Sequence, residues 1–185
     1  SQVTQLIARQ VRELGVYCEL INFKKFNKFK TFDKNIKGII LSGGPKSTLS
    51  KSAPNIKWKL FLNKLPLLGI CYGHQLISNI CGGKTKYSNK KEFGSVILIE
   101  KKKSKLTEGF FTNKKNTVWM SHSDSVMIKP KNFNVIASSK NSKFAILENK
   151  RKKIFTTQFH PEVFHTNNGK KLFSNFLFKI CKIKK

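Results

Sequence analysis

The sequence predicts an α/β fold: a mostly parallel sheet flanked by helices, with a small antiparallel β excursion in the second half. In the first half, apolar runs that end in glycine-rich turns alternate with helix-like segments, as is typical of parallel strands joined by helices. Residues 65–76, LPLLGICYGHQL, combine a strand, a sharp turn and the start of a helix. Short apolar segments between basic loops follow and indicate antiparallel strands. Because we find no repeat or internal linker, we expect one domain over residues 1–185.

Each expected element rests on a local pattern. Apolar residues at helical spacing predict the terminal helices, continuous apolar runs predict buried strands, and a lysine- and phenylalanine-rich stretch at 24–37 predicts a loop. In order, we expect a helix at 2–14, strands at 16–21 and 38–41, a glycine-rich turn at 42–45, a helix at 56–62, a strand at 65–70 and a helix after Cys71. The second half should contain strands at 96–100, 118–120, 134–137, 144–147 and 154–159, then a closing helix at 172–183.

Cys71 lies at the sharp turn, with Gly69 two residues before it and Gly73 two residues after it. Glycines at this spacing let a strained strand-to-helix turn push one side chain out above the sheet edge, as in a nucleophile elbow. The following helix directs its unpaired N–H groups and positive dipole end at Cys71, and both favour a thiolate. A lone cysteine after an apolar run is more often a small buried hydrophobe. The two glycines reverse that balance and predict a cysteine nucleophile.

His160 and Glu162 follow the last expected strand, in the segment HPE. A thiolate nucleophile needs a histidine that transfers protons and a third group that holds the imidazole. If the chain stays extended past Pro161, both side chains project to the same side, so that Glu162 can orient His160 toward Cys71. Alone, HPE is equally compatible with a strand-end turn that carries a surface carboxylate. Together with the elbow, it predicts a Cys-His-Glu triad.

The net charge of +28, with 37 basic and 9 acidic residues, is the strongest compositional feature. Such a charge is compatible with nucleic-acid binding. However, only three basic residues are arginines, and the lysines are scattered instead of being grouped with aromatic residues. We therefore expect a solvated lysine surface and no specific nucleic acid partner. A basic nucleic-acid-binding protein stays as an alternative.

The sequence shows no sign of a membrane or secreted protein. No apolar run approaches the roughly 20 residues that span a bilayer, and no signal peptide opens the sequence, so we expect a cytoplasmic location. The four cysteines lack metal-type spacing such as CxxC, and in a reducing compartment we expect free thiols. We expect neither a disulfide framework nor a metal site.

Three motifs together resemble the class I (triad) glutamine amidotransferases: SGGP at 42–45, GICYGHQ at 69–75 and HPE at 160–162. They occur in the family's order and roughly at its spacing, over almost the whole chain. The resemblance implies a flavodoxin-like, amidotransferase-type sheet. Further segments resemble the amidotransferase part of the GMP synthases more than other branches: SQxTQLIAR at 1–9, VRELGVYCEL at 11–20, VWMSHSD at 118–124 and HPEVFHTxxG at 160–169.

The resemblance also implies a role for each matching residue. Cys71 would attack the side-chain carboxamide of glutamine. His160 would protonate the departing ammonia and then activate water, while Glu162 would orient His160. Backbone N–H groups of Gly44 and Tyr72 would form the oxyanion hole. The implied contacts to the bound glutamine are Gln75, Ser121, His122 and Asp124, with Asp124 as the partner of its α-ammonium group.

In the GMP synthases, the ammonia passes to an ATP pyrophosphatase module that uses ATP and Mg²⁺ to adenylate XMP, and GMP is the product. No phosphate loop such as SGGVDS occurs in these 185 residues. The resemblance therefore implies that this module lies in the same polypeptide or in a separate subunit, and that this chain itself uses no cofactor. The alternatives are an amidotransferase of anthranilate, carbamoyl phosphate or CTP synthesis, and a related cysteine hydrolase that does not use glutamine.

The sequence departs from the family pattern at a few positions. The family opens with an apolar strand that ends in Asp-Phe-Gly just before the position of Ser1, and this strand is absent here. We therefore expect an unpaired sheet edge and an exposed apolar face. His74 stands where methionine is more usual, and we expect a packing or surface role for it. Ser123 replaces a usual glycine and Phe164 a usual threonine, both outside the expected triad.

Overall fold

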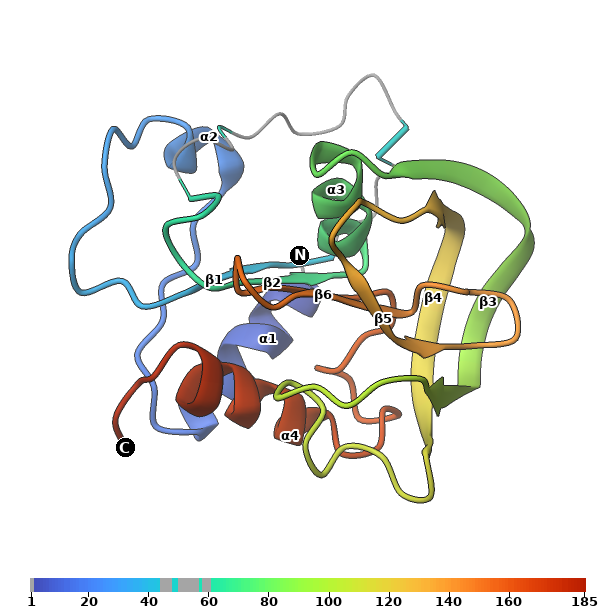
Figure 1. Ribbon diagram of the computed structural model, residues 1–185. Coiled ribbons are helices and arrows are strands. Elements are labelled where there is room, and N and C mark those ends of the chain that lie inside the picture. Colours follow the sequence, from blue (N-terminus) through green and yellow to red (C-terminus); the bar gives the residue numbers. More distant parts are fainter. Residues whose placement is uncertain (1, 44–47, 50–56, 58–60) are drawn as a thin grey trace.

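The computed structural model describes residues 2–43, 48–49, 57 and 61–185 (Figure 1). The described strands form one sheet in the order β1-β2-β7-β6-β5-β3-β4. They are β1 (Ile39–Leu41), β2 (Leu67–Ile70), β3 (Lys84–Glu100), β4 (Lys115–Ile128), β5 (Asn134–Ser138), β6 (Ile146–Asn149) and β7 (Ile154–Thr157). The helices are α1 (Gln2–Glu13), α2 (Phe23–Phe26), α3 (Tyr72–Ile80) and α4 (Gly169–Ser174), which continues as a π-helical segment, η2 (Asn175–Ile180).

The sheet is parallel in one half and antiparallel in the other. β2 pairs in parallel with β1 and β7, whereas β6 pairs antiparallel with β7 and β5, and β3 pairs antiparallel with β5 and β4. The predicted α/β sheet flanked by helices is confirmed, but its antiparallel part is larger than expected. Strands β5, β6 and β7 are joined in turn by short loops, and only antiparallel neighbours can be connected that way.

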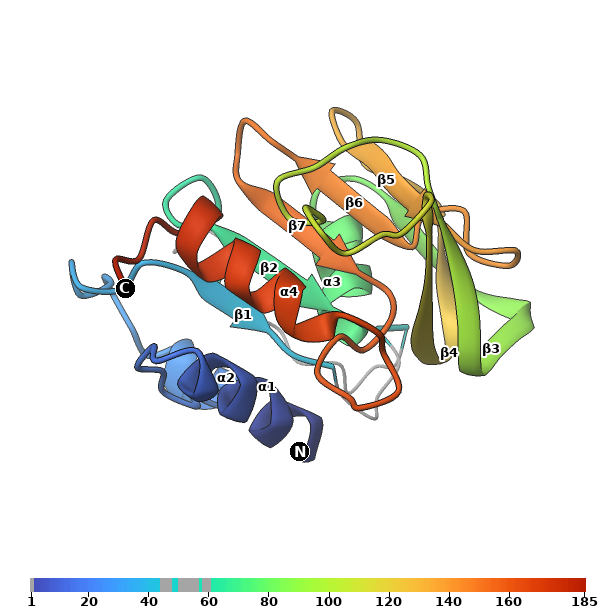
Figure 2. The same ribbon diagram turned by 90° about the horizontal axis from the view of Figure 1, so that it is seen from below.

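Helices cover both faces of the parallel half, with α1 and α4 on one face and α3 on the other (Figures 1 and 2). The side chains of adjacent residues in one strand point to opposite faces of the sheet. Leu68 and Phe155 belong to the apolar cluster that contains side chains of α1 and α4. Leu67 and Ile154 belong to the cluster that contains Ile77 of α3. This burial on both faces explains the continuous apolar runs of β2 and β7.

The first expected helix is confirmed as α1, but the strand expected at 16–21 is wrong. These residues bond to α1 instead of the sheet: Arg12 Nη2 donates to the Cys18 carbonyl at 3.2 Å, and the Cys18 thiol donates to the Ala8 carbonyl at 3.7 Å. Tyr17 is 83% exposed. Alternating apolar residues form a strand only where a neighbouring strand supplies a hydrogen-bond ladder.

The β3–β4 ribbon is much longer than the strands predicted at 96–100 and 118–120. Most residues of β3 before Leu98 are exposed or half-buried, and they include several lysines, so the sequence pattern favours loops there. An antiparallel ribbon with one face in water accommodates such residues. Residues 121–124, which follow the end of the predicted strand, consequently lie within β4.

The other boundaries are closer to expectation. Strands β1, β2, β5 and β7 begin and end within two residues of the predicted bounds, while β6 is displaced by two residues and the closing helix begins three residues early. The loop expected at 24–37 contains the end of the short helix α2. Half of the turn expected at 42–45 and most of the helix expected at 56–62 lie outside the described residues.

The sheet ends in β1 on one side, and the outer edge of β1 meets no other described strand. This agrees with the expectation of an open sheet edge. Within the part of the chain that the structure describes, we find no helix with the length and apolar character needed to cross a membrane.

Gly73 brings α3 against β1, and we expect the variant Gly73→Ala to be destabilised. A Cβ atom on residue 73 would lie 2.4 Å from the Leu41 carbonyl oxygen and 2.9 Å from the Leu41 Cβ, so β1 would have to move. We expect the free energy of unfolding, measured with a denaturant, to fall by about 3 kcal/mol.

Gly82→Ala is the control for that prediction. A Cβ atom there meets nothing within 4 Å, and only the strain of the positive φ (98°) remains. This strain should cost about 1 kcal/mol. Equal losses in the two variants would contradict the steric argument.

Candidate active site

The predicted strand–turn–helix around Cys71 is confirmed. β2 ends at Ile70 and α3 begins at Tyr72, so Cys71 alone forms the turn between them. Its φ of 53° and ψ of −101° lie outside the regions that L residues ordinarily adopt. A Cβ atom on Gly69 would lie 2.7 Å from the Gly73 carbonyl oxygen. The two glycines therefore permit the close approach of strand and helix, while Cys71 itself carries the backbone strain.

His160 and Glu162 are brought to Cys71 by the segment that follows β7. His160 Nδ1 donates to Glu162 Oε1 at 2.7 Å, and the Glu162 side chain is completely buried. The Cys71 side chain is close enough to the His160 ring to contribute to its raised pKa. A Cβ atom on Gly43 would lie 3.1 Å from His160 Cε1 and 3.4 Å from Cys71 Cβ, so a side chain at residue 43 would crowd both groups. The structure thus brings the three residues of the predicted triad together.

The backbone of His160 is tied to β4. The His160 N–H donates to the Trp119 carbonyl at 3.0 Å, and the Thr166 hydroxyl donates to the His160 carbonyl at 2.6 Å. The Trp119 N–H donates to the same Thr166 oxygen at 3.0 Å. These bonds hold the His160 backbone, and with it the ring, in a place that β7 alone would not fix.

The electrostatics of His160 are dominated by its two partners. Burial lowers the pKa of His160, but hydrogen bonds with Cys71 and Glu162 and the charges of both outweigh burial and raise the pKa from 6.5 to about 10. The imidazole is therefore protonated at neutral pH. Among the described residues, Glu162 Oε2 has no hydrogen-bond partner, so the His160 imidazolium is the group that compensates this buried carboxylate.

A second line of buried polar groups reaches Cys71 through α3. Gln75 Nε2 donates to the Asp124 carbonyl at 2.8 Å and to Gln158 Oε1 at 3.2 Å. Gln158 Nε2 in turn donates to Cys71 Sγ at 3.8 Å. The sequence reasoning missed Gln158, whose only local signal is its place two residues before the histidine of HPE.

The predicted glutamine contacts at 121–124 alternate between the two faces of β4, as strand residues do. Ser121 is exposed, yet its carbonyl oxygen accepts from the Cys71 thiol at 3.8 Å. His122 and Asp124 are buried on the opposite face. Ser121 and Asp124 therefore meet the cysteine and its glutamine neighbours through their backbone carbonyls.

Of the two backbone N–H groups predicted for the oxyanion hole, the structure describes that of Tyr72. Tyr72 is the first residue of α3, where a backbone N–H has no acceptor within the helix. Gly44 lies outside the described residues.

His74 on α3 is fully buried, with Nδ1 2.7 Å from Thr156 Oγ1, and burial lowers its pKa to about 3. His74 is thus a neutral packing residue.

Glu92 is the largest omission of the sequence reasoning. Its buried carboxylate accepts from His122 Nε2 at 3.0 Å and from the hydroxyls of Ser139 and Ser142 at 2.6 Å each. Burial raises the pKa of Glu92, but these hydrogen bonds outweigh burial and lower it below 4.5. His122 Nδ1 lies 2.8 Å from the Asp124 carbonyl, so both ring nitrogens face acceptors. Glu92 and His122 are paired across the β3–β4 ribbon, a signal that exists only once the register is known.

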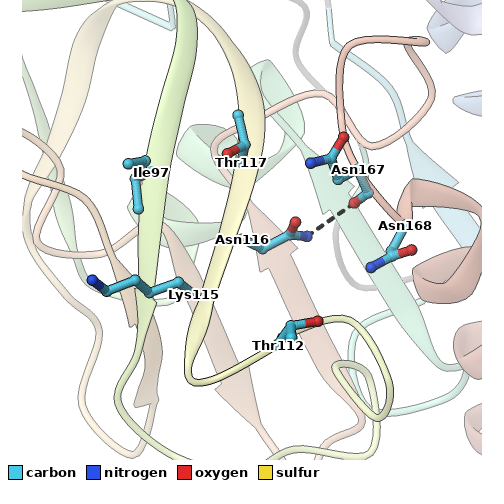
Figure 3. Close-up of a pocket in the computed structure, with 7 residues that line it drawn as sticks. All are labelled: Ile97, Thr112, Lys115, Asn116, Thr117, Asn167 and Asn168. Atoms are coloured by element: carbon cyan, nitrogen blue, oxygen red, sulfur yellow. Dashed lines mark hydrogen bonds between the residues drawn. The ribbon is translucent and has the colours of Figure 1, made fainter.

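A separate depression of about 440 Å³ lies where β3, β4 and the segment before α4 meet (Figure 3). In it, the Asn116 side chain points toward Asn167 and donates to the Asn167 carbonyl at 2.9 Å. The residues that line this depression include no member of the predicted triad and none of the predicted glutamine contacts. The candidate site is therefore identified by its reactive side chains and not by the size of a cavity.

The fold and the site together define a class of α/β proteins that place a cysteine on a strained strand-to-helix turn, within reach of a histidine and a carboxylate. The chain belongs to one family of that class, the class-I glutamine amidotransferases, whose family model matches residues 1–180. The family resemblance drawn from SGGP, GICYGHQ and HPE is thereby confirmed.

The relatives refine this assignment. The glutamine-hydrolysing GMP synthases of Agrobacterium fabrum and Clostridium kluyveri are 47% and 45% identical over 186 and 184 residues. These alignments cover 100% of this chain but 35% and 36% of the relatives, so the chain spans about a third of their length. A crystal structure from Thermoplasma acidophilum, described provisionally as one of the subunits of a GMP synthase, has a TM-score of 0.80 and 30% identity, over 98% of this chain and 89% of its own. A Thermotoga maritima glutamine amidotransferase shares the fold, with a TM-score of 0.70 and 18% identity over 97% and 80% of the two chains.

The variant Glu162→Gln should lower the pKa of His160 from about 10 toward its ordinary value. The carboxylate that stabilises the imidazolium is lost, whereas the burial that opposes it remains. Titration of the His160 ring by NMR measures the change. Glu148→Gln, which alters a buried glutamate of β6, is the control and should leave the titration of His160 unchanged. An unchanged pKa of His160 in Glu162→Gln would contradict the pairing.

The variant Glu92→Gln should be less stable than the wild type at pH 7, by about 2 kcal/mol, because an amide NH₂ group would face hydroxyl and imidazole donors. The loss should shrink in acid. Folding lowers the pKa of Glu92, so the carboxylate stabilises the native state above the unfolded-state pKa near 4.5 and loses that effect as the pH falls further. Urea unfolding at pH 7 and pH 4 measures both values.

Glu148→Gln is the matched control for this pH dependence. Burial raises the pKa of Glu148, so removing this carboxyl should not reduce stability more at pH 7 than at pH 4. The same pH dependence in Glu92→Gln and the wild type would refute the role given to Glu92.

Proposed function

We propose that this chain hydrolyses glutamine to glutamate and ammonia at Cys71, His160 and Glu162, and that the ammonia is used to convert XMP to GMP. The observation that carries the proposal is the buried cluster of Cys71 with a protonated His160 and its carboxylate, on the strained turn of a class-I amidotransferase fold. The pathway is supported by relatives that are glutamine-hydrolysing GMP synthases.

In the first step, Cys71 Sγ attacks the side-chain carbonyl carbon of glutamine, and a carbon–sulfur bond forms. His160 gives a proton to the amide nitrogen, the carbon–nitrogen bond breaks, and ammonia leaves a γ-glutamyl thioester. The transient negative charge on the carbonyl oxygen would be stabilised by the N–H of Tyr72, together with that of Gly44, which lies outside the described residues. Glu162 holds the imidazole in one orientation throughout.

In the second step, His160 is neutral and takes a proton from a water molecule whose oxygen attacks the thioester. The carbon–sulfur bond breaks, glutamate leaves, and the Cys71 thiolate and the His160 imidazolium are restored. Glutamine and water are thus converted to glutamate and ammonia with no net change in the protein. Water becomes the nucleophile only after His160 has lost its proton, which sets the order of the two steps.

The glutamine contacts fall into two groups in this proposal. Asp124 would pair with the α-ammonium group of glutamine. Ser121, whose side chain lies on the opposite face of β4, would contact the same end through its backbone. Gln75 and His122 would act indirectly, because Gln75 already donates to the Asp124 carbonyl and His122 lies between that carbonyl and Glu92. They would fix the strand that carries the direct contacts.

The ammonia would be consumed by an ATP pyrophosphatase module, in the same polypeptide or in a partner subunit. The chain spans about a third of the length of its curated relatives, which leaves room in those proteins for such a module. In this proposal ATP and Mg²⁺ act there, and the glutaminase reaction needs no cofactor.

The first test is glutamine-dependent ammonia release, with and without a GMP synthase ATP pyrophosphatase module, XMP and ATP-Mg. Cys71→Ala should reduce the release at least about 1,000-fold, because no covalent intermediate can form. Cys81→Ala alters a partly buried cysteine at the end of α3 and should retain activity.

The outcomes separate the two parts of the proposal. Undiminished release in Cys71→Ala would refute the triad. The chain could release ammonia while no GMP forms, although the same module makes GMP from ammonium salts. That result would refute the pathway and favour another amidotransferase reaction.

A further inference from the structure

We infer that Gln158 is a further catalytic residue, which donates a hydrogen bond from its side-chain amide to the Cys71 sulfur. Its effect on glutamine hydrolysis rests on the proposed function. The contact itself involves only the protein and can be tested without glutamine.

The orientation of the Gln158 amide follows from the groups behind it. The Asp124 carbonyl can only accept, so Gln75 must present its NH₂ group there, at 2.8 Å. The same NH₂ group lies 3.2 Å from Gln158, which must therefore present its oxygen. The NH₂ group of Gln158 is then left facing Cys71 Sγ, at 3.8 Å. Turning over either amide would bring two donors or two acceptors into contact.

The surroundings of Gln158 hold this arrangement in place. The side chains of Gln158 and Gln75 are buried, with 1% and 4% of each residue exposed. The Gln158 N–H donates to the Ala145 carbonyl at 2.8 Å, which fixes the backbone next to β7. At the other end, the Asp124 carbonyl is also contacted by His122 Nδ1 at 2.8 Å. In such low-dielectric surroundings a fixed donor is stronger than it would be in water.

The donor distinguishes between the two forms of the sulfur. As a thiol, Cys71 donates to the Ser121 carbonyl at 3.8 Å. Once the proton is lost, that contact joins two acceptors, whereas the bond from Gln158 becomes charge-assisted and stronger. Gln158 therefore favours the reactive form of the nucleophile, in addition to His160. The buried titratable side chains of the surrounding elements include His160 and Glu162 after β7, Tyr72 and His74 on α3, His122 and Asp124 on β4, and Glu92 on β3.

The test is the rate at which iodoacetamide alkylates Cys71 in the full chain at one fixed pH, followed by mass spectrometry of the Cys71 peptide. Gln158→Met removes the donor and roughly keeps the volume. Gln158→Glu keeps an acceptor for Gln75 but places a carboxylate oxygen against the sulfur. We expect the rate to fall about tenfold in Gln158→Met and further in Gln158→Glu, as for the loss of a hydrogen bond to a charged group.

The matched control is Asn175→Asp, another change of a buried amide to a carboxyl. Asn175 is 2% exposed and donates to the carbonyls of Leu106 and Glu108, so its replacement should leave the alkylation rate of Cys71 unchanged. Thermal unfolding shows which variants are folded, and if Gln158→Glu is not, Gln158→Met decides.

An unchanged rate in folded Gln158→Met would overturn the inference even if glutamine hydrolysis is confirmed. A reduced rate in a protein that does not hydrolyse glutamine would confirm the contact and overturn the proposed function.

Discussion

The strained turn at Cys71 is the constraint on which the rest of the site depends. A residue with a Cβ atom holds a φ of 53° here because β2 is fixed on both sides by parallel neighbours and α3 is pressed against the sheet. The Cys71 N–H donates to the Thr157 carbonyl at 2.8 Å, so the turn is also bonded to the end of β7. Since β2 and β7 are parallel, their carboxyl ends lie side by side. The histidine that follows β7 therefore lies close to the cysteine that follows β2.

The antiparallel half of the sheet completes the site from the opposite end of the strand order. β4 is the last strand of the order, yet the His160 N–H bonds to the Trp119 carbonyl of β4. The sheet must therefore curl until its far edge lies beside the segment after β7. This curl is what allows one short stretch of β4 to contact the cysteine, the histidine and the buried Gln75 together.

The site residues that could be predicted from the sequence are those that a short local motif identifies. Cys71 stands between two glycines, and His160 and Glu162 are separated by one residue, so each assignment needed only a short window. Gln158 and Glu92 could not be found that way, because their partners Gln75 and His122 lie 83 and 30 residues away in the sequence. Those pairings depend on strand order and register, and the same lack of long-range information produced the false strand at 16–21 and the short estimate of β3.

The unusual composition leaves this chemistry largely untouched. Of the 9 acidic residues, Glu92, Asp124 and Glu162 are buried at the site, and two of these three pair with His122 and His160. The N–O distances of these two pairs are 3.0 and 2.7 Å. The lysine surface acts through water and salt, which screen charges over about 8 Å at physiological ionic strength. A surface can therefore become strongly basic while the buried Glu162 keeps His160 protonated beside the cysteine.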